Sequence, residues 1–175
     1  MSAPPPARRG LAAAFVAYGL AMGVLEAVVV VYLRELYYPH GFAFPMAVMP
    51  SRVYAAELVR EVCTIVMLLG VAFLAGRTPL QRWASFLLGF AIWDLAYYAG
   101  LKAFLDWPAS LLEWDVLFLI PAPWFGPVLA PVLYCTAMAA VGWAMLAADR
   151  AGVRVKRAEW AVLAASAALV LWPFM

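Results

Sequence analysis

Four carboxylate side chains lie inside stretches of the sequence that are apolar enough to cross a lipid bilayer. They are Glu26, Glu57, Glu61 and Asp94. A carboxylate deep in the hydrocarbon costs about 2.5–3.5 kcal/mol on insertion scales, and such residues usually face the interior of a helix bundle and mark a site. One basic residue, Arg60, shares these stretches. This excess of acid over base is the strongest indication of a functional site in the sequence.

The excess charge can be balanced in three ways, and each leads to a different function. Protonation would suit proton-linked transport or acid–base catalysis, for which we select Glu57, Glu61 and Asp94. A bound cation would be held by these three acids and Glu26, and oxygen ligands favour a hard divalent ion such as Ca²⁺, Mg²⁺ or Mn²⁺. The third way is a neutral ion-pair network that only fixes helix register. Its bases would be Arg60 and three residues at the rim, Arg34, Arg52 and Lys102.

The composition is that of an integral membrane protein with almost no soluble mass. Of the 175 residues, 68% are hydrophobic and 13% are charged, whereas a soluble domain has about 45–50% apolar and about 25% charged residues. We therefore expect membrane lipid as a partner. No basic face or nucleic-acid-binding motif is present, so nucleic acid is not expected. The sequence contains a single histidine, His40, which excludes bis-histidine ligation, and no haem is expected.

Five segments are long enough to cross a bilayer, which takes about 20 predominantly apolar residues. They cover residues 11–33, 53–75, 80–105, 126–148 and 158–173. The sequence therefore predicts an all-α integral membrane protein in which residues 1–175 form one transmembrane domain, a bundle of five helices.

The basic residues between these segments predict the orientation. One side holds Arg8, Arg9, Arg77, Arg82, Arg150, Arg154, Lys156 and Arg157, and the other holds Arg34, Arg52 and Lys102. Because loops rich in lysine and arginine remain in the cytoplasm, we expect a cytoplasmic N-terminus and an external C-terminus. The protein is accordingly predicted to be a multi-pass protein of a bacterial-type inner membrane.

The segment before the fourth span, residues 106–125, is rich in proline and tryptophan. Its apolar part is too short to cross the membrane, and non-helical backbone at depth must be buried in protein or line a wet cavity. We expect a re-entrant or interfacial segment, which either covers the acid site from the outer side as a lid or only forms an aromatic belt at the membrane interface. Two of its residues, Asp115 and Trp124, are predicted to contact a substrate.

The four acids are expected to converge in the outer half of the membrane. Counting 1.5 Å per residue places them about 8–17 Å below the outer ends of their spans. Tyr97 and Tyr98 follow Asp94 at helical spacing, so their hydroxyl groups are predicted to line the same cavity. Arg60 is predicted to hold a carboxylate or the anionic head group of a substrate.

Small residues in the first span indicate a close helix–helix contact. Gly19 and Gly23 form a GxxxG pattern, which lets another helix approach closely. A homo-oligomer through this face, or a larger membrane complex, is therefore a further expectation.

Three functional classes follow from these observations. The first is proton- or cation-linked transport of, or binding to, a small or lipid-like substrate in an outward-facing site. The second is a small membrane enzyme that acts on a lipid-linked substrate by carboxylate acid–base chemistry or with a metal. The third is a non-catalytic accessory or assembly subunit of a larger membrane complex, in which the acids form a structural network.

Overall fold

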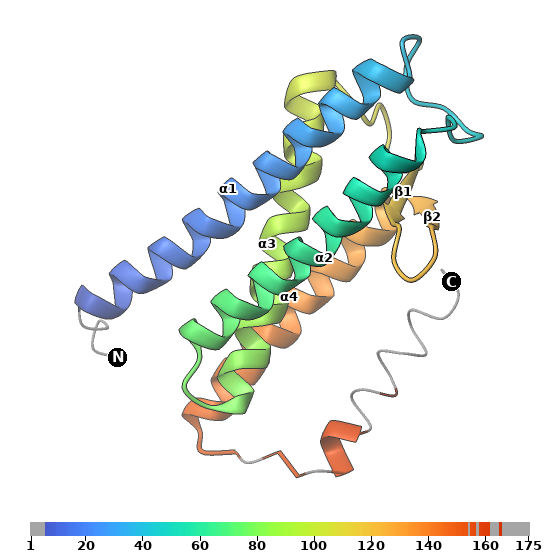
Figure 1. Cartoon of the computed structure of the whole chain (residues 1–175). Helices are drawn as coiled ribbons and strands as arrows, with labels where there is room; N and C mark the ends of the chain where they lie inside the picture. The colour runs from blue at the N-terminus through green and yellow to red at the C-terminus, as the bar shows by residue number, and fades with distance from the viewer. Residues whose placement is uncertain (1–5, 154, 157, 162–164, 166–175) are drawn as a thin grey trace.

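The computed structural model describes residues 6–153, 155, 156, 158–161 and 165, and long helices dominate it (Figure 1). These helices are α1 (Pro6–Tyr37), α2 (Ser51–Ala75), α3 (Pro79–Leu105) and α4 (Leu129–Arg150). Within the described part of the chain, these four helices are long and apolar enough to cross a membrane. The chain is therefore a multi-pass membrane protein, as its composition predicts.

The first four predicted spans correspond to these helices, with differences at their ends. α1 continues to Tyr37, so Arg34 lies on its last turn and not in a loop. α4 begins at Leu129 because Gly126 and Pro127 belong to a strand, so the prediction of a helix from residue 126 is wrong by three residues. Most of the predicted fifth span, residues 158–173, lies outside the described residues.

A β-hairpin lies between α3 and α4, so the prediction of an all-α fold is wrong for this segment. β1 (Trp114–Phe118) pairs antiparallel with β2 (Trp124–Pro127), and the pairing is interrupted by an irregularity between Val116 and Phe118. Tryptophan, valine and phenylalanine favour strands, and the prolines of the connecting turn cannot continue a helix. The hairpin lies near the ends of α2 and α4 that face away from the N-terminus (Figure 1).

α3 is the central helix, because it packs against α1, α2 and α4. Its approach to α1 depends on small residues: Gly23 faces the carbonyl oxygen of Trp93, and Gly100 faces Ala27. The face that contains Gly19 and Gly23 is therefore covered by α3 of the same chain. A second copy of the protein could use this face only by displacing α3.

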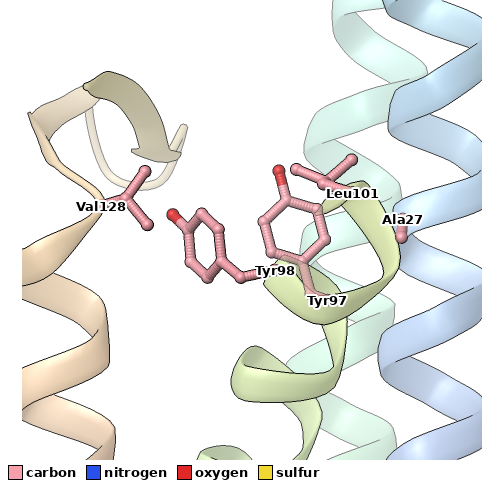
Figure 2. Close-up of a cluster of buried hydrophobic side chains, with 5 residues drawn as sticks. All are labelled: Ala27, Tyr97, Tyr98, Leu101 and Val128. Atoms are coloured by element: carbon pink, nitrogen blue, oxygen red, sulfur yellow. The ribbon is translucent and has the colours of Figure 1, made fainter. Parts of the chain in front are cut away.

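A buried cluster joins α1, α3 and the start of α4 (Figure 2). Its members are Ala27, Tyr97, Tyr98, Leu101 and Val128. The rings of Tyr97 and Tyr98 meet edge to face with their centroids 4.8 Å apart. Tyr98 extends toward Val128, whereas Tyr97 lies on the side of Leu101 and Ala27 (Figure 2). The side chains of the two neighbouring tyrosines therefore pack against different parts of the cluster.

We expect Gly23→Ala to destabilise the protein. A Cβ atom at this position would overlap the carbonyl oxygen of Trp93 and lie 2.7 Å from Cβ of Ala96, so α1 would have to move away from α3. Such overpacking typically costs about 1–3 kcal/mol and should lower the unfolding temperature in detergent. Gly70→Ala is the matched control, because open space surrounds Gly70 and alanine is the better helix former. Equal unfolding temperatures for the two variants would contradict the α1–α3 packing.

Candidate functional site

A cavity of about 110 Å³ lies between α1, α2, α3 and β1. The structure brings together in its lining all four acids selected from the sequence: Glu26, Glu57, Glu61 and Asp94. Arg60, Tyr97 and Asp115, which the sequence also selects, line it as well. The cavity therefore gathers residues from three helices and the hairpin around one space, which we call the acid cavity.

Arg60 holds two of the four acids. Its Nε donates to Oε2 of Glu57 at 2.8 Å, and its Nη1 pairs with Oε1 of Glu26. Glu57 and Arg60 are three residues apart on α2, so they share a face of the helix, and α1 supplies Glu26. The planar guanidinium presents its donors in a fixed fork, which suits contact with two carboxylates. These three side chains form what we call the Arg60 triad, with one more acid than base.

A second ion pair lies in the lining of the acid cavity, at the last turn of α1. Nη2 of Arg34 lies 3.1 Å from Oδ1 of Asp115, and the two side chains are 8% and 3% exposed. The hydroxyl of Tyr98 donates to Oδ2 of Asp115 at 3.3 Å. Burial raises the pKa of Asp115 to about 6, although the Arg34 guanidinium opposes this shift. The pair thus ties the hairpin to α1 and α3.

Aromatic rings enclose the Arg34 guanidinium. Its central carbon lies 3.7 Å from the ring centroid of Trp107 and 4.4 Å from that of Phe42. Both distances are within the range of cation–π attraction. The sequence predicts Arg34 only as a rim base, because the rings that enclose it lie in two different loops.

Glu61 forms no ion pair with a base among the described residues. Both of its carboxyl oxygens instead accept from the backbone N–H of Leu119 at 3.0 Å. Leu119 directly follows β1, and a buried N–H without a partner would be costly. Glu61 therefore anchors the turn of the hairpin to α2.

Asp94 likewise has no basic partner within the described ranges. Its Oδ2 accepts from the thiol of Cys135 on α4, with a sulfur–oxygen distance of 3.2 Å. Asp94 is 9% exposed and Cys135 is 1% exposed. No pattern in the sequence indicates this contact, since the two residues belong to helices separated by the hairpin.

The lining of the acid cavity is strongly acidic. Among the described residues it contains the carboxyl groups of the four intramembrane acids and Asp115, but only the guanidinium groups of Arg34 and Arg60. If all five carboxyl groups and both guanidinium groups were ionised, the cavity would carry a charge of −3. The neutral network predicted as one alternative would also need Lys102 and Arg52, but Lys102 pairs with Asp106 at 2.7 Å and Arg52 is exposed and does not line the cavity.

No protein-family model, curated protein or solved structure matches this chain. Fold-level analogy therefore offers no functional assignment here. The function follows from the chemistry and geometry of the acid cavity alone.

The loop between α1 and α2 covers the acid cavity, which the sequence did not predict. Tyr38, Phe42, Met46 and Met49 of this loop line it. The loop is held by its own contacts, since the hydroxyl of Tyr38 accepts from the N–H of Ala47 at 2.9 Å. Its three prolines and many aromatic residues are visible in the sequence, but its position over the acids depends on the tertiary structure.

Two of the predicted substrate contacts lie outside the acid cavity. Tyr98 touches it only through its hydrogen bond to Asp115 and otherwise packs toward Val128 (Figure 2). Trp124 packs against Phe118, with ring centroids 6.5 Å apart, and contributes nothing to the lining.

The described residues contain no group of three or more histidine, cysteine, aspartate or glutamate side chains arranged to hold a metal ion. Glu26 and Glu57 lie in the same cavity as Glu61 and Asp94, but Arg60 already engages the first two. The described residues therefore give no geometric support to the metal site predicted from these four acids.

Proposed function

We propose that this protein binds and transports a small substrate across the membrane in exchange for protons, and that substrate and protons use the acid cavity. The observation that carries this proposal is the excess of carboxyl groups over guanidinium groups in the lining. Uncompensated negative charge is costly in a low-dielectric site. Glu61 and Asp94, which no base pairs with in the described structure, would therefore be neutralised by protons or by positive charge on the substrate. Because protons and the positive charge of the substrate compete for the same carboxyl groups, binding of the substrate would release protons.

We further propose that the acid cavity faces the outer side of a bacterial-type inner membrane. Arg77 and Arg82 lie at the connection of α2 to α3, and Arg150 ends α4, at the end of the bundle opposite the hairpin (Figure 1). Their positive charge supports a cytoplasmic position for that end and for the N-terminus. A fifth span over residues 158–173 would then place the C-terminus outside.

The hairpin is proposed to be a re-entrant element on the outer side. Leu119 contacts Glu61, which lies ten residues after the first residue of α2, or about 15 Å along the helix axis. Backbone at such a depth needs hydrogen-bond partners within the protein. The pairing of β1 with β2 and the contact of Leu119 with Glu61 supply several of them.

Infrared difference spectroscopy of the purified protein tests the proposed proton sites. Between acidic and alkaline pH, we expect a carbonyl band of protonated carboxyl groups to titrate, and Glu61→Gln and Asp94→Asn should each remove part of it. Both variants should accumulate at wild-type levels, because the amide oxygen of either new side chain can still accept the hydrogen bond that the carboxyl group accepts. Glu35→Gln is the control, since Glu35 is exposed on α1. A spectrum without any titrating buried carboxyl band would contradict the proposal.

An accessory-subunit function is the second candidate, and one specific observation favours it. The Arg60 triad and the contact of Glu61 with Leu119 hold separate elements together, as a purely structural network would. This candidate predicts that Glu61→Gln and Asp94→Asn fail to accumulate in the membrane. It also predicts a stoichiometric partner on purification in mild detergent, and purification without such a partner would count against it.

A further inference from the structure

We infer that the substrate of the acid cavity is a zwitterion, with an oxyanion that binds Arg34 and an ammonium group that binds near Glu61 and Asp94. This inference rests on the proposed function, because it assigns a substrate class to the same cavity. It follows from how charge and hydrogen-bonding capacity are distributed along the cavity.

The outer end of the acid cavity offers an unused donor. Nη1 of Arg34 is buried and has no hydrogen-bond partner among the described residues, although Arg34 lines the cavity. Nη2 is occupied by Asp115, and the rings of Trp107 and Phe42 hold the guanidinium plane. A buried charged donor without an acceptor is costly. A carboxylate or phosphate oxygen is the strongest acceptor for a guanidinium.

The inner part of the acid cavity has the opposite character. Arg34 and Glu26 are eight residues apart on α1, which is about 12 Å along the helix, and the Arg60 triad lies at the Glu26 end. There Glu61 and Asp94 contribute carboxyl groups that lack a basic partner in the described structure. The rings of Trp93 and Phe118, whose next residues in the chain are Asp94 and the Glu61 partner Leu119, line the cavity and suit an ammonium group through cation–π attraction.

A zwitterion is the substrate class that satisfies both ends at once. A simple anion would enter a cavity with excess negative charge, which is unfavourable. A simple cation would leave Nη1 of Arg34 without an acceptor. A molecule that carries both groups compensates the inner acids and completes the hydrogen bonding of Arg34.

Three probes of similar size test this inference on the unaltered protein. They are γ-aminobutyrate, butylamine and butyrate, and their binding is measured by calorimetry in detergent. We expect γ-aminobutyrate to bind about tenfold more tightly than either single-charge probe, as one charge-assisted hydrogen bond would give. Equal binding of butylamine and γ-aminobutyrate would overturn the inference and leave the proton-linked function standing. The infrared test would fail independently if the proposed function were wrong.

The variant Arg34→Lys tests the residue itself. It keeps the positive charge but loses the guanidinium fork and its stacking, so γ-aminobutyrate should bind about tenfold more weakly while butylamine binding is unchanged. Arg52→Lys is the matched control, because Arg52 is exposed on the same side of the bundle. If Arg34→Lys does not fold, the comparison of the three probes on the wild-type protein still tests whether the cavity prefers a zwitterion.

The same pair of groups occurs in a soluble amino acid and in the head group of phosphatidylethanolamine. If the substrate is the lipid, phosphatidylethanolamine in nanodiscs should raise the unfolding temperature of the protein relative to phosphatidylglycerol. It should also compete with γ-aminobutyrate for binding. If the substrate is a soluble amino acid, γ-aminobutyrate should bind tightly in nanodiscs of either lipid, and phosphatidylethanolamine should not compete with it. The absence of both effects overturns the inference.

Discussion

Arg60→Met is expected to prevent stable folding in the membrane. The substitution leaves Glu26 and Glu57 without their base, and these two side chains are 12% and 10% exposed, so little water can replace it. Removing one partner of a buried ion pair typically costs about 3–5 kcal/mol. Because the Arg60 side chain is 22% exposed, we expect the lower end of this range, which is still a large part of the stability of a small protein. The expected result is a loss of monodisperse protein in size-exclusion chromatography of solubilised membranes.

Two companion variants separate the charge effect from a simple loss of packing. Arg52→Met removes an exposed base and should behave as wild type. The triple variant Arg60→Met, Glu26→Gln, Glu57→Gln removes all three charges and should recover much of the lost protein. Wild-type accumulation of Arg60→Met alone would show that the Arg60 triad contributes little to stability.

The helices could be predicted from the sequence because their apolar runs are long, and length is what a membrane span requires. The meeting of the acids in one cavity could also be predicted, since counting residues places the acids at similar levels along their helices. Gly23 correctly indicated a close helix contact, but the pattern does not identify the partner, which is α3 of the same chain. The helix ends were less predictable, and the extension of α1 to Tyr37 brought Arg34 into the site.

The hairpin could not be predicted from the sequence. A short apolar run such as residues 114–118 fits a strand or a buried helix equally well, and periodicity does not distinguish them. The contacts that define the acid cavity join residues far apart in the chain, as in Arg34 with Asp115 and Asp94 with Cys135. Such pairs depend on helix packing and leave no local pattern. The position of Asp115 in the proline- and tryptophan-rich segment before α4 predicts a place in the site, but it does not predict the ion pair.

Asp115→Ala is expected to have the second large effect on stability. It leaves the Arg34 guanidinium buried with neither of its terminal nitrogens paired in the described structure, at a cost of about 3–5 kcal/mol. The hydroxyl of Tyr98 also loses its hydrogen-bond acceptor, and the hairpin loses its ion pair to α1. We expect a markedly lower unfolding temperature in detergent, whereas Glu35→Ala, next to Arg34 but exposed, should leave it unchanged.

Removing both charges of this pair separates its structural role from its role in binding. The double variant Arg34→Met, Asp115→Leu replaces a buried ion pair with apolar side chains, which is often neutral or stabilising, so it should unfold near the wild-type temperature. It lacks the Arg34 donor, however, and should bind γ-aminobutyrate no more tightly than butylamine. A double variant as unstable as Asp115→Ala would mean that the ion pair itself, and not the unpaired charge, determines the stability. A stable double variant that still prefers γ-aminobutyrate would remove Arg34 from substrate recognition.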